Sequence, residues 1–219
     1  MNYVSQVGQD KILDRLLSFK RFGFFVDIGA NDGYTGSNSL FFEQERGYKG
    51  ICVEPFRNHK LYTRKCQIIY KAVSSDNKDR TLFISSISHV LNHLKNDDHQ
   101  RHYPGIERTI GVPCCTLEDI VQDKEIDFVS IDVEGHEPEI FRVYEPKGNV
   151  KIFCIENVYN KTLKIKGYYR LTRTLFDDIY VKRIPLTYWG LYYLFHGFVF
   201  KFVQRATRIK KRYFPKAWL

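Results

Sequence analysis

Short apolar runs rich in β-branched and aromatic residues recur along the chain, separated by polar stretches that are compatible with helices. This alternation predicts an α/β fold with a largely parallel sheet. Strands are predicted at 23–28, 51–53, 68–73, 80–85, 126–133 and 150–155, with an antiparallel pair at 169–172 and 179–183. Helices are predicted at 10–17, 39–46, 56–65, 116–120 and 137–144, the second ending at Gly47 and the fourth capped by Thr116.

The charge of the chain is unevenly distributed. Residues 161–219 hold fourteen Lys and Arg and two Asp, a net charge of +12, whereas the first 160 residues carry −3. Within the basic part, 184–200 has no Asp, Glu, Lys or Arg and is crowded with aromatic residues, and a basic run over 201–216 follows. We therefore predict one domain over 1–183 and an aromatic and basic C-terminal extension over 184–219.

Two roles are open for the extension. Its 17 uncharged residues are marginal for a membrane span, which needs about 20, and suit a segment lying on an anionic membrane surface better. A helix that packs on the domain or on a second copy of the chain fits equally well. Five cysteines without a C-x-x-C pair, and an N-terminus without a secretory signal, favour a cytoplasmic protein, with peripheral membrane contact or self-association through 184–216.

Residues 27–33, Asp-Ile-Gly-Ala-Asn-Asp-Gly, place an acidic residue at the end of an apolar strand and glycines in the turn before a helix. Gly29 lets the backbone approach a ligand, while Ala30, Asn31 and Gly33 continue a turn whose N–H groups can act as donors. The negative charge of Asp27 suits the amino-acid part and sulfonium of S-adenosylmethionine and would repel a pyrophosphate. The dinucleotide fingerprint G-x-G-x-x-G is also missing from this turn.

Glu54 ends the second predicted strand, 27 residues after Asp27, which accommodates one strand–helix–strand step. An acid at this position can accept hydrogen bonds from both ribose hydroxyls of a nucleoside-type cofactor. Ala72 and Val73 end the third predicted strand, where small apolar residues fit beside an adenine ring, although ordinary strand packing explains them equally well. Together with the glycine turn, these residues predict a site for S-adenosylmethionine.

The chain resembles the FkbM-type methyltransferase family over about residues 3–183. The resemblance is carried by SQVGQD (5–10), GFFVDIGANDG (23–33), SNS (37–39), GICVEP (50–55), KAVS (71–74), TLED (116–119), IDFVSIDVEGHE (126–137) and IEN (155–157). The C-terminal extension lies outside it.

This resemblance implies a Rossmann-like class I methyltransferase fold, with a seven-stranded, mostly parallel sheet that has one antiparallel strand and helices on both faces. It also implies S-adenosyl-L-methionine as methyl donor and a hydroxyl acceptor, often on a sugar. The N-terminal segment with Gln6 and Gln9 would fold over the mouth of the site. Asn38, Pro55 and Asp132 complete the cofactor-binding residues that we predict.

Asp132, Glu134, His136 and Glu156 follow the fourth and fifth predicted strands and are the predicted catalytic residues. Ligands of open α/β sheets sit at the carboxyl ends of strands, so these side chains should converge. One of them would accept the proton of the acceptor hydroxyl, and His136 titrates in a suitable range, but their division of roles stays open. A divalent cation could also bind there, although we do not expect one, and no metal site is predicted among the histidines of 89–102.

These features predict an O-methyltransferase that moves the methyl group of S-adenosylmethionine to a hydroxyl of a sugar in a glycan or glycoconjugate. A nucleic-acid methyltransferase is an alternative because the pI is about 9.2. Nucleic acid is disfavoured as a partner because no Asn/Asp-Pro-Pro-Tyr/Phe tetrapeptide follows the fourth strand and the positive charge is remote in sequence from the acidic site. A catalytically idle cofactor-binding module tethered to a membrane or assembly is the third alternative.

Overall fold

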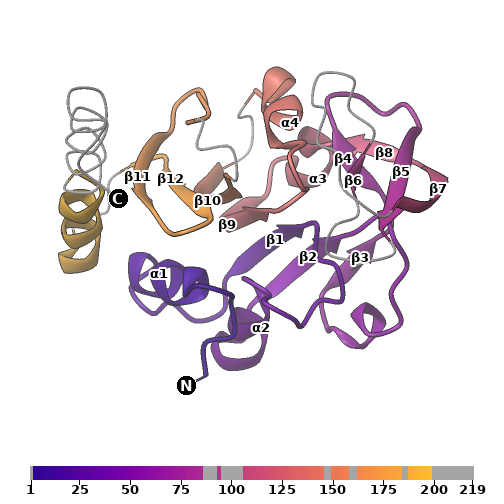
Figure 1. The fold of residues 1–219 in the computed structure, drawn as a ribbon. Helices are drawn as coiled ribbons and strands as arrows, with labels where there is room; N and C mark the ends of the chain where they lie inside the picture. Colours follow the sequence, from indigo (N-terminus) through magenta and orange to yellow (C-terminus); the bar gives the residue numbers. More distant parts are fainter. Residues whose placement is uncertain are drawn as a thin grey trace, which may run out of the picture.

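The computed structural model describes residues 2–85, 93–94, 106–145, 149–157, 162–183 and 187–198. A seven-stranded sheet with the order β11-β12-β10-β9-β1-β2-β3 forms its centre (Figure 1). Its strands are β1 (Phe24–Ile28), β2 (Lys49–Val53), β3 (Gln67–Ile69), β9 (Glu125–Ile131), β10 (Asn149–Glu156), β11 (Tyr169–Arg173) and β12 (Asp177–Val181). β12 pairs antiparallel with both of its neighbours, and the other neighbouring pairs are parallel. The predicted mostly parallel α/β sheet is confirmed.

Helices cover both faces of this sheet (Figure 1). α1 (Gln9–Leu16) and α2 (Leu40–Arg46) bury apolar side chains on one face, and α3 (Leu117–Val121) and α4 (Glu137–Val143) do so on the other. Apolar layers on both faces explain why the central strands are nearly continuous apolar runs. The predicted C-terminus of α2 and N-terminus of α3 are also confirmed. α2 ends at Gly47, whose φ is 70°, and Thr116 caps α3 in a reciprocal capping box with Asp119.

The order of the strands creates a crevice at one edge of the sheet. From β1 the chain proceeds outward through β2 to β3, and later returns to place β9 and β10 on the other side of β1. This reversal between β1 and β9 is a topological switch point, at which the loops after neighbouring strands diverge. The carboxyl ends of β1, β2, β9 and β10 therefore surround a natural place for a ligand.

Two local predictions were wrong. The strand expected at 68–73 is split into β3 in the central sheet and β4 (Ala72–Ser74), which pairs with β8 (Cys114–Thr116) instead. The helix expected at 56–65 is only a 3-10 turn, Leu61–Thr63. Side chains compete for the backbone here: the Glu54 carboxylate accepts the N–H of Phe56, and Asn58 accepts the N–H of Lys60.

A separate three-stranded sheet lies between β4 and β8 in the sequence. β5 (Arg80–Ser85) pairs antiparallel with both β6 (His93–Leu94) and β7 (Ile106–Val112). The predicted strand at 80–85 thus exists but belongs to this small sheet rather than the central one. Within 88–108, where no helix or strand is predicted, the described residues 93–94 and 106–108 are strand, and the rest lies outside the described residues.

Candidate functional site

The turn after β1 forms the floor of the crevice. Gly29 has a φ of 81°, in the left-handed region that favours glycine. A Cβ atom at this position would lie 1.7 Å from the carbonyl oxygen of Asp132, so the turn approaches the end of β9 more closely than any other residue would allow. The N–H of Gly29 donates to the carbonyl of Val53 (2.9 Å), which ties the turn to β2.

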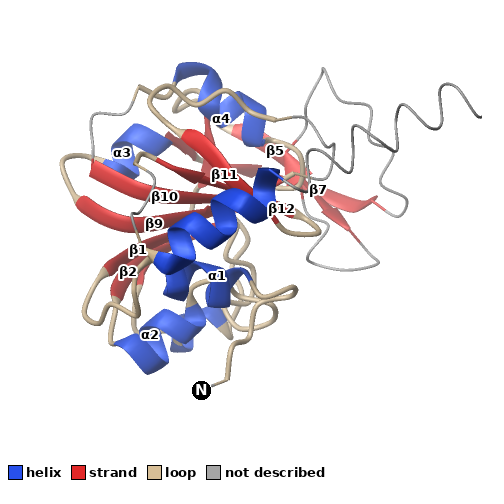
Figure 2. Ribbon diagram, turned by 90° about the vertical axis from the view of Figure 1, so that its left-hand side faces the viewer, coloured by secondary structure: helices blue, strands red, loops and turns tan. Residues whose placement is uncertain are grey.

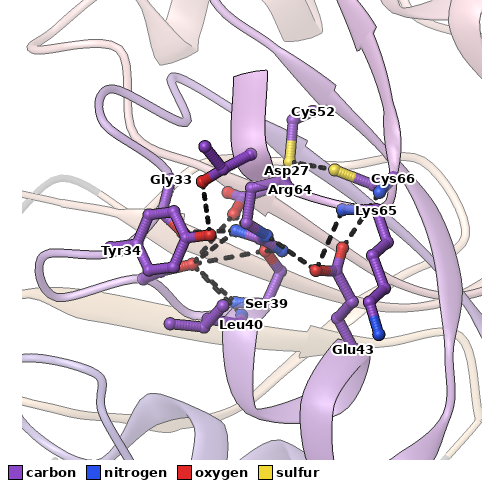
Figure 3. Close-up of polar contacts among 12 residues, drawn as sticks. Asp27, Gly33, Tyr34, Ser39, Leu40, Glu43, Cys52, Arg64, Lys65 and Cys66 are labelled. Atoms are coloured by element: carbon purple, nitrogen blue, oxygen red, sulfur yellow. Dashed lines mark hydrogen bonds and ion pairs between the residues drawn. The ribbon is translucent and has the colours of Figure 1, made fainter. Parts of the chain in front are cut away.

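Hydroxyl groups hold the carboxylate of Asp27 in place at the end of β1 (Figure 3). Ser39 Oγ donates to Asp27 Oδ2 at 2.5 Å, and Ser37 Oγ lies 3.5 Å from the same oxygen. Burial raises the pKa of Asp27 above its ordinary value, against the hydrogen bonds from the serines and the charge of Arg64. The carboxyl group is therefore fixed in orientation on the wall of the crevice before any ligand arrives.

Arg64 is a residue of this site that the sequence did not reveal. Its fully buried side chain donates to the carbonyl oxygen of Gly33 (2.5 Å) and to Ser39 Oγ (3.1 Å), and it pairs with Glu43 at 3.2 Å (Figure 3). The guanidinium thus braces the glycine turn and the hydroxyl that holds Asp27. These partners are 21 to 31 residues away in sequence, so no local pattern marks the arginine.

Glu54 faces the crevice from the end of β2. Its two carboxylate oxygens accept the N–H groups of Asn31 (2.9 Å) and Phe56 (2.8 Å). Burial raises its pKa to about 7, and these two hydrogen bonds oppose the shift. A carboxylate offers about four acceptor positions, so after binding both amides it can still accept from a ligand with neighbouring hydroxyl groups.

The raised pKa of Glu54 predicts a pH-dependent stability for the ligand-free protein. Between the ordinary value of 4.5 and about 7, the folded protein retains a proton that the unfolded chain has released. This stabilisation is complete below the unfolded pKa and is lost as the pH rises through the folded pKa, in total about 3 kcal/mol. Urea unfolding at pH values of about 5 and about 8 should show a fall for the native protein that Glu54→Gln reduces by that amount. If the free energy of unfolding falls equally with pH in both proteins, the raised pKa does not belong to Glu54. A destabilisation by the substitution that is the same at both pH values cancels in this comparison.

Asp132, Glu134 and Glu156 converge beyond the ends of β9 and β10. One carboxylate oxygen from each lies within 4.8 Å of the others. Loss of hydration and repulsion from neighbouring carboxylates raise the pKa of Asp132 well above its ordinary value and that of Glu156 to about 10. Carboxyl groups this close together favour holding a proton over being ionised together. Such a cluster of oxygens also suits a divalent cation.

A cavity along the carboxyl edge joins the glycine turn, Glu54 and the acidic cluster. The predicted site residues that line it are Gln6, Asp27, Gly29, Ala30, Asn31, Asn38, Glu54, Pro55, Ala72, Val73, Asp132, Glu134 and Glu156. Three predicted residues, Gln9, Gly33 and His136, do not lie on its wall.

These three residues have contacts elsewhere. His136 is buried at the N-terminus of α4, with Nε2 2.9 Å from Ser74 Oγ, and so has no access to the cavity. Gln9 Nε2 donates to Asp177 (2.6 Å), and this bond holds the N-terminal segment against β12. Gly33 packs against Arg64 and gives it a carbonyl acceptor, behind the wall rather than on it.

The small inserted sheet contributes a part of the wall that sequence reasoning missed. Leu82 of β5 and His93 and Leu94 of β6 line the cavity, and the two leucines pack in one apolar cluster with Ala72. The His93 ring stacks on Phe83 at 5.4 Å. In the sequence, only the histidine-containing polar stretch pointed to a role for this segment in the site. It did not indicate which surface of the domain the segment would cover.

Comparison with known families gives this geometry a context. A sequence model of the methyltransferase FkbM domain matches residues 27–176. The chain belongs to the FkbM methyltransferase family. The FkbM match begins at Asp27 and includes Glu54 and the whole acidic cluster, while Gln6 and the helical residues 188–198 lie outside it. No curated protein matches the chain in a sequence search.

The FkbM domain makes the chain a methyltransferase, for which S-adenosylmethionine is the usual methyl donor. Among the described residues, no helix is both long enough and apolar enough to cross a membrane.

Proposed function

We propose that this FkbM methyltransferase is an S-adenosylmethionine-dependent O-methyltransferase of the Rossmann-like class I type, and that its acceptor is a hydroxyl group of a sugar in a glycan or glycoconjugate. The observation that carries the proposal is the convergence of Asp132, Glu134 and Glu156, with one carboxylate oxygen from each within 4.8 Å of the others, on the wall of the same cavity as Glu54. Glu54 thus offers hydrogen-bond acceptors to the hydroxyl groups of a nucleoside, and the acidic cluster offers a base to the hydroxyl group that is methylated.

The residues present fit S-adenosylmethionine. Asn38 Nδ2 donates to Ser130 Oγ (2.9 Å), which orients the amide, and its buried Oδ1 has no partner among the described residues. An ammonium group such as that of the donor's amino-acid part would satisfy this oxygen. Five carboxyl side chains line the cavity against one lysine, Lys71, which favours a ligand with a net positive charge. Glu54 would accept the ribose hydroxyls.

The acidic pair supplies the proton chemistry of the proposed reaction. When bound, S-adenosylmethionine supplies a methyl group that a nucleophile can displace from a sulfonium. As the acceptor oxygen bonds to the methyl carbon, the carbon–sulfur bond breaks and the hydroxyl proton must leave. The ionised member of the pair Asp132 and Glu156 accepts this proton. The positive charge of a bound sulfonium would stabilise the ionised form of the pair and so prepare the base.

The charge of the cavity also supports the acceptor class. Carboxylates bind the hydroxyl groups of a sugar as acceptors, whereas they repel the phosphates of a nucleic acid backbone. Leu82 and Leu94 on the inserted sheet would give the carbon face of a sugar ring an apolar surface.

S-adenosylmethionine should therefore raise the melting temperature of the protein. At a concentration of about 100 times Kd the stabilisation is about 2.7 kcal/mol, which corresponds to roughly 5–10 °C for a chain of this size. Glu54→Ala should abolish the shift, and Glu125→Gln, a control at the opposite end of β9, should retain it. An unchanged melting temperature of the native protein would refute S-adenosylmethionine as the methyl donor.

The acceptor is tested with the same protein and donor labelled in the methyl group. Label should enter glycans as a methyl ether that is stable to alkali, and should not enter RNA or DNA. Label in nucleic acid alone would refute the sugar acceptor while leaving the donor site intact.

A further inference from the structure

Residues 188–198 form a helix that packs on the domain through one face (Figure 2). The guanidinium of Arg15 on α1 lies 4.0 Å from the centre of the Trp189 ring and donates to the hydroxyl of Tyr193 (3.1 Å). Gly197 approaches β11 so closely that a Cβ there would lie 2.2 Å from the carbonyl oxygen of Leu171. The helix is therefore docked along the edge of the central sheet.

The other face of this helix is apolar and exposed. Its side chains form what we call the outer stripe: Tyr188, Leu191, Tyr192, Leu194, Phe195 and Phe198. At 3.6 residues per turn these six positions span roughly 160° of the helix circumference. Tyr188, Phe195 and Phe198 are 72%, 69% and 68% exposed, so the domain does not cover them.

This arrangement departs from the usual pattern of a surface helix. A helix that docks one face on a domain normally presents charged and polar side chains on the other. Residues 187–198 contain no Asp, Glu, Lys or Arg at all. Contiguous exposed apolar surface of this kind marks an interaction site.

In the sequence, positive charge occurs on both sides of the helix that carries the outer stripe. Lys182 and Arg183 precede the helix and are exposed. The sequence of 199–219 contains seven Lys and Arg and no Asp or Glu. An apolar and aromatic centre between basic ends is complementary to a lipid surface, where rings enter the headgroup region and cations meet anionic headgroups.

We propose that the outer stripe binds the surface of a membrane that contains anionic lipids. The docked face of the helix stays against α1 and β11, so the segment lies along the membrane surface. A second copy of the chain is a poorer occupant because pairing two stripes would bring together two basic regions, each with a net charge of +12 over residues 161–219.

Sedimentation of the full-length protein with vesicles tests this proposal. The native protein should pellet with phosphatidylcholine vesicles that contain phosphatidylserine, and less with phosphatidylcholine alone or at high salt. Replacing Leu191, Phe195 and Phe198 together by Ser should lower the partition coefficient by about tenfold or more. A matched control, Phe22→Ser with Val143→Ser, removes exposed apolar side chains from other parts of the surface and should pellet like the native protein.

Equal melting temperatures for the variants and the native protein establish that the folds are intact. The proposal is overturned if the triple variant pellets as well as the native protein, or if the native protein does not pellet with the anionic vesicles. It is also overturned if light scattering without lipid shows a dimer that the triple variant converts to monomer. None of these readouts requires methyl transfer, so the result is independent of the proposed activity.

Discussion

Replacing Glu156 by Gln should lower kcat for methyl transfer by about 10²–10⁴-fold, the contribution typical of a positioned base, with Asp132→Asn giving a comparable loss. Each substitution removes a group that can take the acceptor's proton and leaves an amide in its place. Because the two carboxyl groups lie in one cluster, we expect them to act as a unit. The double variant should therefore be no slower than the slower single variant.

Steady-state rates with labelled donor, together with calorimetric titration of S-adenosylmethionine, check this prediction. Glu156→Gln should bind the donor nearly as tightly as the native protein, so that the loss appears in kcat. Glu125→Gln, an exposed acid at the start of β9, is the control for a general charge effect and should retain full activity. Two additive losses would show that the carboxyl groups act separately.

A chelator distinguishes proton transfer from metal assistance at the same cluster. If the carboxyl groups of Asp132, Glu134 and Glu156 accept the hydroxyl proton without a bound metal, EDTA leaves the rate of methyl transfer unchanged. If they hold a divalent cation, EDTA abolishes the rate and added Mg²⁺ restores it, which would contradict the role of the pair as a base.

Gly29→Ala should cost about 3–5 kcal/mol of stability, from left-handed backbone strain and from overpacking, and should abolish the thermal shift with S-adenosylmethionine. The added methyl group would collide with the carbonyl oxygen of Asp132. To avoid it, the turn must move away from β9 and toward β2, which distorts its hydrogen bond to Val53. Both the floor of the cavity and the position of the acidic cluster would change.

Gly167→Ala is a matched control for this substitution. Gly167 has a φ of 80°, almost the same as that of Gly29, but nothing lies within 4 Å of a Cβ placed there. It should therefore lose only the strain contribution, about 1–2 kcal/mol, and keep the shift. Equal losses for the two variants, measured by urea unfolding, would show that the close contact with Asp132 is unimportant.

The elements that could be predicted are those whose signals are local. β1, β9 and β10 are apolar runs buried on both faces, and α2 and α3 carry their own end signals in Gly47 and Thr116. Their position in the same sheet then placed the acids after β1, β2, β9 and β10 at one edge. This part of the site followed from topology without any knowledge of side-chain contacts.

The features that could not be predicted depend on contacts between distant segments. The run 68–73 is apolar apart from Lys71, and a single lysine does not mark the point after Ile69 where the chain changes from one sheet to another. His136 carries the chemistry of a base, yet its partner is Ser74, which is 62 residues away. Arg64 likewise has a role only because folding brings Gly33 and Ser39 to it.

Because the small sheet β6-β5-β7 is an insertion, the part of the cavity wall that it supplies is exchangeable. The chain leaves the core after Ser74 and returns at Cys114, which is paired in register with Ala72, so both ends of the excursion are neighbours. A segment with adjacent ends can be lengthened, shortened or replaced with little effect on the elements that flank it. This wall of the cavity can thus diverge among descendants of one ancestor while the glycine turn and Glu54 on the central sheet are preserved. The same two junctions are the places to cut when building chimeras with a different wall.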